Sequence, residues 1–315
     1  MLNLVRNENM KIYLRVRTWV LVGILMAFCL LAALISHNEK SSTGHPRIDW
    51  KTELQQNIQS MERELQSEET PGPLKKRLIE QLAVSRYQLD HHIPPTEATM
   101  WGSVQKQAWL VTLATLFTVI VAADVVAAEF TWGTIKLLLI RPSSRAKILL
   151  SKYISTMLFA LFLLVILFAG SVLMNGVLSG FTGWSAPVLS IDEAGAVRES
   201  SAAGTVLAAY GLKMIELIMV VTLAFMISSV FRSSVLSVGV SMFLMLTGQL
   251  LTMLLLRWEW GKYFLFANTD LTPYLAGQPL AEGMTLGFSV SVLAVYFVVF
   301  NALSWLVFTR RDVAA

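Results

Sequence analysis

Long apolar runs separated by shorter polar segments dominate this chain of 315 residues. A helix needs about 20 predominantly apolar residues to cross the hydrocarbon layer of a membrane, which is roughly 30 Å thick. The pattern predicts an all-α polytopic membrane protein with six transmembrane helices. Their expected positions are Trp19–Ile35, Trp109–Ala128, Ile154–Leu178, Thr205–Val230, Val235–Leu256 and Leu286–Phe308.

The first run is the shortest and follows basic residues, as a signal peptide would. No small-x-small cleavage pattern follows it cleanly, and Trp19 with Arg15 and Arg17 in front is typical of an interfacial anchor. We therefore expect residues 1–36 to form a cytoplasmic N-terminus and a retained first helix. Residues 107–315 would hold helices two to six. Because Lys and Arg concentrate on one set of connecting segments, the positive-inside rule predicts an N-in, C-in topology.

Residues 37–106 differ in composition from the rest and show two helical patterns. Leu54, Ile58, Met61 and Leu65 follow coiled-coil spacing, and the turn ETPGP then interrupts the pattern before a second leucine-rich helix. This pattern predicts a helical hairpin outside the cell. It is either a spacer or assembly element, or a substrate gate or dock for an extracellular partner. All four histidines lie in this region, and we expect them to be solvated, with no metal site.

Composition agrees with a membrane protein, since 55% of residues are hydrophobic and 15% are charged, against about 25% charged in soluble domains. The basic balance follows from topology, so we expect no nucleic-acid partner. No GxxxxGK[ST], HExxH, GxSxG or CxxC motif is present, and the single cysteine excludes an intrachain disulfide. We expect neither catalysis nor a cofactor bound by this chain.

Three ionisable residues enter the predicted spans: Asp124, Lys213 and Glu216. Lys213 and Glu216 are three residues apart, so both lie on one helical face and can pair. Because an unpaired charge at the bilayer centre is costly, we expect the pair to point inward. It is either a polar patch on a translocation path or subunit interface, or a mutually neutralised structural pair.

The segment 129–147, EFTWGTIKLLLIRPSSRAK, lies between the second and third runs and carries more pattern than a reversing loop needs. Phe130, Ile135 and Leu138 recur at helical spacing, which predicts a short amphipathic helix in the inner membrane interface. The alternative is a plain interfacial loop that obeys the positive-inside rule.

The same segment contains stop and start signals for helices. Pro142 ends the amphipathic helix, because proline disfavours helical conformation at Arg141. A serine at 143 or 144 can cap the next helix, which begins with Arg145 and Lys147.

The pattern ExxxGTxxxLLxxPxxR resembles the signature of ABC-2-type permeases, the membrane subunits of ABC exporters. It runs through Glu129, Gly133, Thr134, Leu138, Pro142 and Arg145. The order of six spans, the large segment after the first span and the basic tail TRRD are also similar to that family. The helical outer segment most resembles a subgroup from Gram-positive bacteria.

The resemblance implies that residues 129–147 form a coupling helix seated in a groove of a separate ATPase. Glu129 would hold the start of that helix through its dipole or a basic partner. Gly133 and Thr134 would allow close backbone approach. The basic residues of the segment would meet acidic groups or lipid phosphates: Arg141, Arg145 and Lys147.

The resemblance also implies the partners. Two ABC ATPase subunits would carry ATP and Mg²⁺, and a second copy of this permease or a similar permease would complete the complex in the plasma membrane of a bacterium. Membrane lipid is the expected solvent of the spans. Two alternatives from other classes remain: an ion-driven carrier or channel without an ATPase, and a membrane scaffold or sensor that uses its outer segment.

Overall fold

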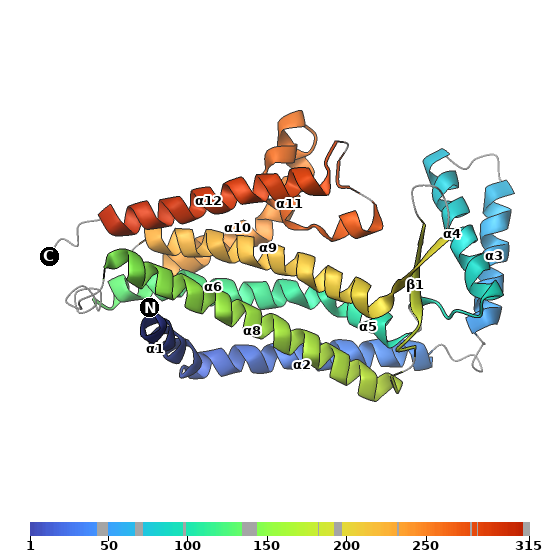
Figure 1. Ribbon diagram of the computed structural model, residues 1–315, viewed down its shortest axis with the longest axis horizontal. Helices are drawn as coiled ribbons and strands as arrows, with labels where there is room; N and C mark the ends of the chain where they lie inside the picture. The colour runs from blue at the N-terminus through green and yellow to red at the C-terminus, as the bar shows by residue number, and fades with distance from the viewer. Residues whose placement is uncertain are drawn as a thin grey trace. The chain divides into compact units, whose positions relative to one another are not determined.

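The computed structural model describes residues 1–42, 50–66, 72–96, 99–133, 144–181, 183–191, 197–231, 233–277, 279–281 and 283–310. Helices account for nearly all of the regular structure (Figure 1). The α-helices are α1 Leu2–Tyr13, α2 Val16–Ser42, α3 Trp50–Gln66, α4 Gly72–Asp90, α5 Met100–Lys106, α6 Leu110–Thr131, α8 Arg145–Ser179, α9 Ala202–Val230, α10 Ser234–Leu255, α11 Leu265–Thr269 and α12 Leu286–Arg310. Short 3-10 helices are η2 Gln107–Trp109, η3 Glu259–Tyr263 and η4 Thr272–Ala276.

Six helical segments of the described chain are long and apolar enough to cross a membrane, which confirms the predicted all-α, multi-pass class. They are Val16–Asn38, Met100–Thr131, Arg145–Leu178, Ala202–Val230, Ser234–Leu255 and Leu286–Arg310. The second and third begin earlier than predicted, because polar residues at their starts continue the helix instead of ending it. The second also continues through Glu129 to Thr131, so the first residues of the predicted coupling helix belong to α6.

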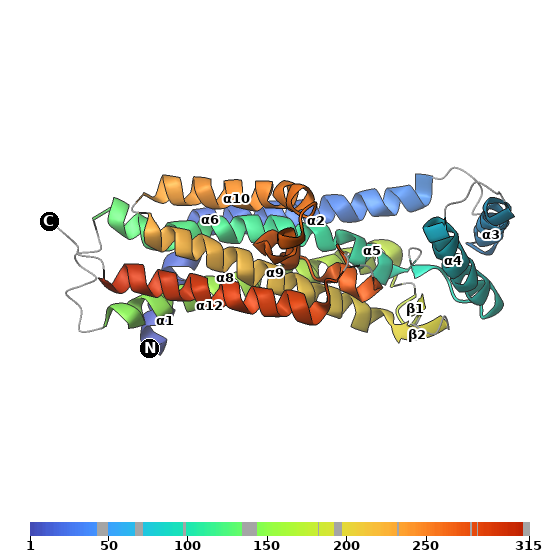
Figure 2. The same cartoon turned by 90° about the horizontal axis from the view of Figure 1, so that it is seen from above.

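The chain forms two compact units, and the first comprises residues 1–27, 109–167 and 211–315. Its helices run side by side along one direction (Figures 1 and 2). α6 is the most enclosed of them, while α10 and α12 keep many apolar side chains on the outside. The core combines residues from α6, α9, α10, α11 and α12, including Val119, Val221, Met245, Phe266 and Leu293. This burial pattern is the one expected for a helix bundle in lipid, whose outer helices keep their apolar surface on the outside.

The second unit comprises residues 28–108 and 168–210. Here α3 packs against α4, as the sequence predicts, with Leu54 and Ile58 of the seam buried and Arg86 bonded to Glu62 at 2.6 Å. Strands β1 Pro187–Ile191 and β2 Val197–Ser201 pair antiparallel, an element that the sequence analysis missed. Tyr87 of α4 donates a hydrogen bond to Glu199 of β2 at 3.1 Å. That this unit is extracellular stays a prediction.

At one end of the first unit, four chain segments gather: α1, the last turn of α6, the first turn of α8 and the last turn of α12 (Figures 1 and 2). The motif residues Glu129, Gly133, Arg145 and Lys147 all lie in these segments or just beyond them. The chemistry singled out in the sequence is therefore concentrated at this end of the unit.

Candidate functional site

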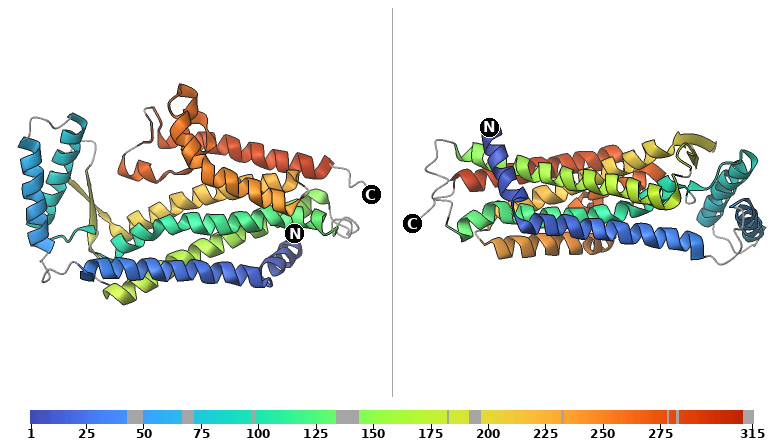
Figure 3. Two further views of the ribbon diagram at one scale, coloured as in Figure 1. Left: turned by 180° about the vertical axis from the view of Figure 1, so that it is seen from behind. Right: turned by 90° about the horizontal axis from the view of Figure 1, so that it is seen from below.

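Helix α1 precedes the first membrane span and was not predicted. It joins α2 at an elbow around Leu14 and turns sharply away from the α2 axis (Figure 3). Two hydrogen bonds fix the elbow, from Thr18 Oγ1 to the Ile12 carbonyl at 2.5 Å and from Trp19 Nε1 to the Tyr13 carbonyl at 2.8 Å. Because these bonds satisfy carbonyls at the end of α1, the helix can stop there without exposing unpaired backbone groups.

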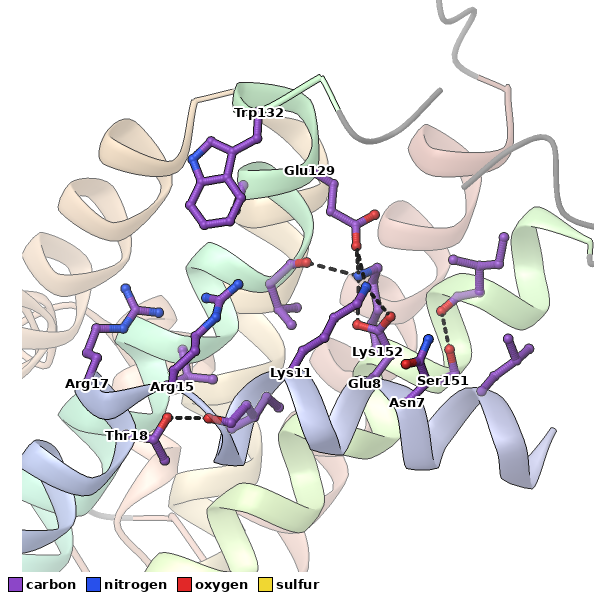
Figure 4. A pocket seen from close by; sticks show the side chains of 16 residues that line it. Asn7, Glu8, Lys11, Arg15, Arg17, Thr18, Glu129, Trp132, Ser151 and Lys152 are labelled. Carbon is purple, nitrogen blue, oxygen red and sulfur yellow. Dashed lines mark hydrogen bonds and ion pairs between the residues drawn. The ribbon is translucent and has the colours of Figure 1, made fainter. Parts of the chain in front are cut away.

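A network of four charged residues holds α1 against α6 and α8 (Figure 4). Lys152 of α8 is at its centre, with only 1% of its side chain exposed. Its Nζ lies 2.8 Å from Glu8 of α1 and 2.5 Å from Glu129 of α6, and it donates a third hydrogen bond to the Val125 carbonyl at 3.2 Å. An ammonium has three donors, so Lys152 uses them all within the protein. Burying this charge is tolerable because every donor is paired.

Lys11 completes the network on its solvent-exposed side. Its Nζ lies 2.8 Å from Glu8 and 3.2 Å from Glu129, so two lysines face two glutamates and the formal charges cancel. Burial disfavours the charged form of Glu8, but the two ammonium groups outweigh it and hold the pKa of Glu8 below its usual value. Burial likewise opposes charging of Lys11, and bonds to both glutamates outweigh it, so the pKa of Lys11 is raised. Glu8 and Lys11 are therefore both ionised at neutral pH.

A second group of charges lies beside the first, around Asp124 of α6. Arg15, at the elbow, and Arg17, in the first turn of α2, both donate to Asp124 Oδ2, at 3.0 Å and 2.8 Å. The other carboxylate oxygen accepts a short hydrogen bond from the Ser234 hydroxyl at the start of α10. Sequence reasoning treated both arginines as topology signals. The structure shows that they also neutralise an acid within a membrane span, as burial of a charge requires.

The backbone of α6 is bonded to α9 just before Glu129. Ser228 Oγ donates to the Ala123 carbonyl at 2.7 Å and accepts from the amides of Val126 and Ala127 at 3.3 Å and 3.1 Å. A side chain inserted into a helical hydrogen-bond ladder is a recognised cause of local bending. The last turns of α6 are thus attached to α1, α8, α9 and α10.

The residues of the motif lie in different structural environments. Glu129 lies in the last turn of α6, where a helix dipole disfavours a carboxylate, so its interaction with basic partners, and not the dipole of α6, stabilises it. Gly133 has φ +69° just after the end of α6, a position that favours glycine and terminates helices. No described atom lies within 4 Å of the point that a Cβ would occupy there, so the conformation and not crowding within the chain explains this glycine.

Four predicted coupling residues lie outside the described residues: Thr134, Leu138, Arg141 and Pro142. The predicted helix start is confirmed, because Ser144 Oγ accepts from the Lys147 amide at 3.4 Å and α8 begins at Arg145. Arg145 donates to the Thr309 carbonyl of α12 at 3.4 Å, whereas the Lys147 side chain is exposed.

Lys213 and Glu216 of α9 pair at 2.8 Å, as their spacing predicts. A third partner, Asp270, was not singled out from the sequence and lies 3.0 Å from Lys213. Burial disfavours the charged form of Asp270, but hydrogen bonds from Thr272 and the nearby Lys213 ammonium outweigh it and lower the pKa of Asp270. The triad holds the segment that connects α10 to α12 against α9. Among the described residues, no group of His, Cys, Asp and Glu could hold a metal ion.

Comparisons with known proteins agree with a membrane protein. Residues 74–314 match the family described as "Protein of unknown function (DUF2705)". The chain is 43% identical over 318 residues to "Uncharacterized protein YhcI" of Bacillus subtilis (strain 168), with 100% of both chains covered. It is 34% identical over 199 residues to "Uncharacterized membrane protein YdbK" of the same organism, over 62% of this chain and 76% of that one.

Proposed function

We propose that this chain, which belongs to the DUF2705 family, is the permease subunit of an ATP-driven ABC-2-type exporter. It would span a bacterial plasma membrane with both termini in the cytoplasm and pair with a second permease. Two ATPase subunits on separate chains would bind ATP and Mg²⁺. ATP hydrolysis on those partners, and no covalent chemistry on this chain, would drive translocation.

The observation that carries the proposal is the position of Glu129. This acid begins the ABC-2-like motif, and it lies where Lys152 of α8 and Lys11 of α1 meet at one carboxylate. A force applied to the segment after α6 would therefore be transmitted to a second span and to the elbow that leads into α2. Rigid ion-paired contacts transmit displacement better than a loop, because packed interfaces do not deform continuously.

The bundle in which this site lies supports the same function. The described chain has six candidate spans. The motif segment begins at the end of α6, which terminates at Gly133, and it ends at the start of α8, which Ser144 caps. In the proposed mechanism, closure of the two ATPases around ATP pushes on the segment between these two positions. The spans then rock between inward and outward access.

Affinity purification of the tagged chain in mild detergent, followed by mass spectrometry and an ATPase assay, tests this proposal. We expect an ATPase to copurify from cells that express the native neighbours. Glu129→Gln and Arg145→Glu should weaken its retention or uncouple its activity from transport. Glu259→Gln, at an exposed position in η3, is the matched control and should behave like the wild type. A well-folded preparation without any ATPase would contradict the proposal.

A second candidate, an ion-driven carrier, draws on the triad of Lys213, Glu216 and Asp270. Two of these residues, Lys213 and Glu216, lie in a candidate span, and ionisable residues within spans are a chemistry that ion-coupled carriers use. Transport that persists when ATP is depleted, and that Glu216→Gln abolishes, would favour the carrier. Loss of transport on ATP depletion would favour the exporter.

A further inference from the structure

A cavity of about 400 Å³ opens beside the charged network, where α1, α2, α6 and α8 meet (Figure 4). Its polar lining comes from both charge clusters, and apolar side chains such as Ile12 and Val121 form the rest of the wall. The cationic and aromatic side chains in the lining are Lys11, Arg15, Arg17, Trp132 and Lys152. The proposed coupling role uses Lys11 and Lys152 but does not use Arg15, Arg17 or Trp132.

Arg15 and Arg17 retain most of their hydrogen-bonding capacity. A guanidinium carries five N–H donors, and among the described residues each arginine donates one hydrogen bond, to the same oxygen of Asp124. Their side chains are 37% and 44% exposed, so the remaining donors are accessible. Two cations share one carboxylate, which leaves an excess positive charge. A planar fork of donors with positive charge matches the oxygens of a phosphate.

The surroundings favour a lipid over a soluble anion. Leu14 and Val16, which alternate with the arginines in sequence, are exposed apolar side chains at the end of a membrane span. Trp132 is also exposed, and Arg15 lies over its ring with Cζ 5.5 Å from the centroid. Aromatic and basic side chains of this kind are enriched where a membrane meets water. A ligand with a phosphate head and apolar chains would contact both kinds of surface.

We propose that this cavity binds the phosphate headgroup of an anionic phospholipid. Arg15 and Arg17 would hold the phosphate oxygens, Trp132 would flank the headgroup, and the acyl chains would run along the exposed side of the elbow. The cavity shares Glu129, Lys11 and Lys152 with the proposed coupling network, but lipid binding by the two arginines does not require an ATPase partner. A lipid bound there would sit between the elbow and α6 and would stabilise the docked position of α1.

Native mass spectrometry of the full chain tests the proposal, with the protein released from nanodiscs of equal phosphatidylglycerol and phosphatidylcholine with identical acyl chains. We expect the wild type to retain phosphatidylglycerol preferentially. Arg15→Gln with Arg17→Gln should lower the ratio of retained lipids by about tenfold to thirtyfold, since each cation near an anionic surface contributes roughly a fivefold factor. The matched control is Arg6→Gln with Arg310→Gln, which removes the same charge from two exposed positions outside the cavity. It reports the general attraction of basic residues for anionic lipid and should lower the ratio much less than the change at Arg15 and Arg17.

Equal ratios in the two double variants would overturn the site. Displacement of phosphatidylglycerol from the wild type by excess inorganic phosphate would overturn the lipid assignment and indicate a soluble phosphate ligand. Because removing both arginines strips Asp124 of its cations, Arg15→Lys with Arg17→Lys provides a folded comparison that keeps the charges but loses the forks. We expect it to lower the ratio severalfold, with unchanged elution and circular dichroism. A wild-type ratio in that variant would contradict recognition by the guanidinium groups.

Discussion

Replacing Lys152 by Met is the most direct test of the charged network. The substitution keeps the length and volume of the side chain while removing the ammonium. In the structure this ammonium is 1% exposed and lies within 2.8 Å of two carboxylates, those of Glu8 and Glu129. Without it, Glu8 and Glu129 would lose their most deeply buried ammonium partner, while Lys11, whose side chain is 42% exposed, would still face both.

The magnitude follows from that geometry. Breaking a buried ion pair by removing one partner costs about 3–5 kcal/mol, because the other charge stays buried without compensation. Lys11 still neutralises part of the remaining charge, so we expect the lower end, about 3 kcal/mol of unfolding free energy. Unfolding by sodium dodecyl sulfate in mixed micelles, followed by circular dichroism, would measure it. Lys147→Met makes the same chemical change at an exposed position of the same helix and should change stability by less than about 0.5 kcal/mol.

A sign reversal sharpens this test. In the wild type, Glu129→Gln removes a partner of Lys152 and should destabilise the protein. In the Lys152→Met background the carboxylate of Glu129 has lost its nearest ammonium, so the same change should stabilise the protein. The effects of Glu129→Gln in the two backgrounds should differ by a coupling energy of about 0.5–3 kcal/mol. If Glu129→Gln were equally destabilising in both backgrounds, or if Lys152→Met left stability within about 0.5 kcal/mol of wild type, the account of the network would be refuted.

Three further predictions use the same unfolding assay. The pKa of Glu8 is below its usual value, so its contribution to stability is complete above about pH 5 and is lost as pH falls through the folded-state pKa. The difference in unfolding free energy between wild type and Glu8→Gln should therefore shrink as pH falls toward about 3.5. A difference that stays constant with pH would contradict this. Gly133→Ala should lower the free energy of unfolding by about 1 kcal/mol, because residue 133 has a positive φ. Gly211→Ala, at an uncrowded helical position, should stabilise the protein slightly. Effects of the same sign at both glycines would refute this reasoning. Lys213→Met should destabilise by about 3 kcal/mol and exceed the effect of Asp270→Asn, because it leaves two carboxylates facing each other; the reverse order would exclude Lys213 as the centre of the triad.

The spans and the α3–α4 pair could be predicted because their signals are local. An apolar run long enough to cross a bilayer is rarely found outside a membrane span, and heptad spacing at Leu54 and Ile58 identifies a packed helix face. The β-hairpin could not be predicted in the same way. Its strands, PVLSI and VRESS, are short and lack a clear alternation of apolar and polar residues, and their pairing is set by contacts with each other and with α4.

Only part of the candidate site could be predicted from the sequence. Glu129, Gly133 and the cap at Ser144 carry local signals and were found, and the spacing of Glu8 and Lys11 could have identified an ion pair on α1. Lys152 carries no such signal. Its partners are 144 and 23 residues away in the chain, and only the packing of α1 and α6 against α8 brings them together. Asp270 likewise lies far from Lys213 in sequence.

The basic residues of this chain therefore have two physical roles that a count of charges does not separate. Arg15, Arg17 and Lys152 belong to the charge bias from which the positive-inside rule predicts orientation, yet each also neutralises a specific acid in the second half of α6. Reversing any of them would disturb packing and topology together, and the two effects could not be told apart. Arg6 is exposed, and no ion pair joins it to another described residue. Charge reversal at Arg6 therefore tests orientation separately from packing, while folding and coupling are tested at the paired residues.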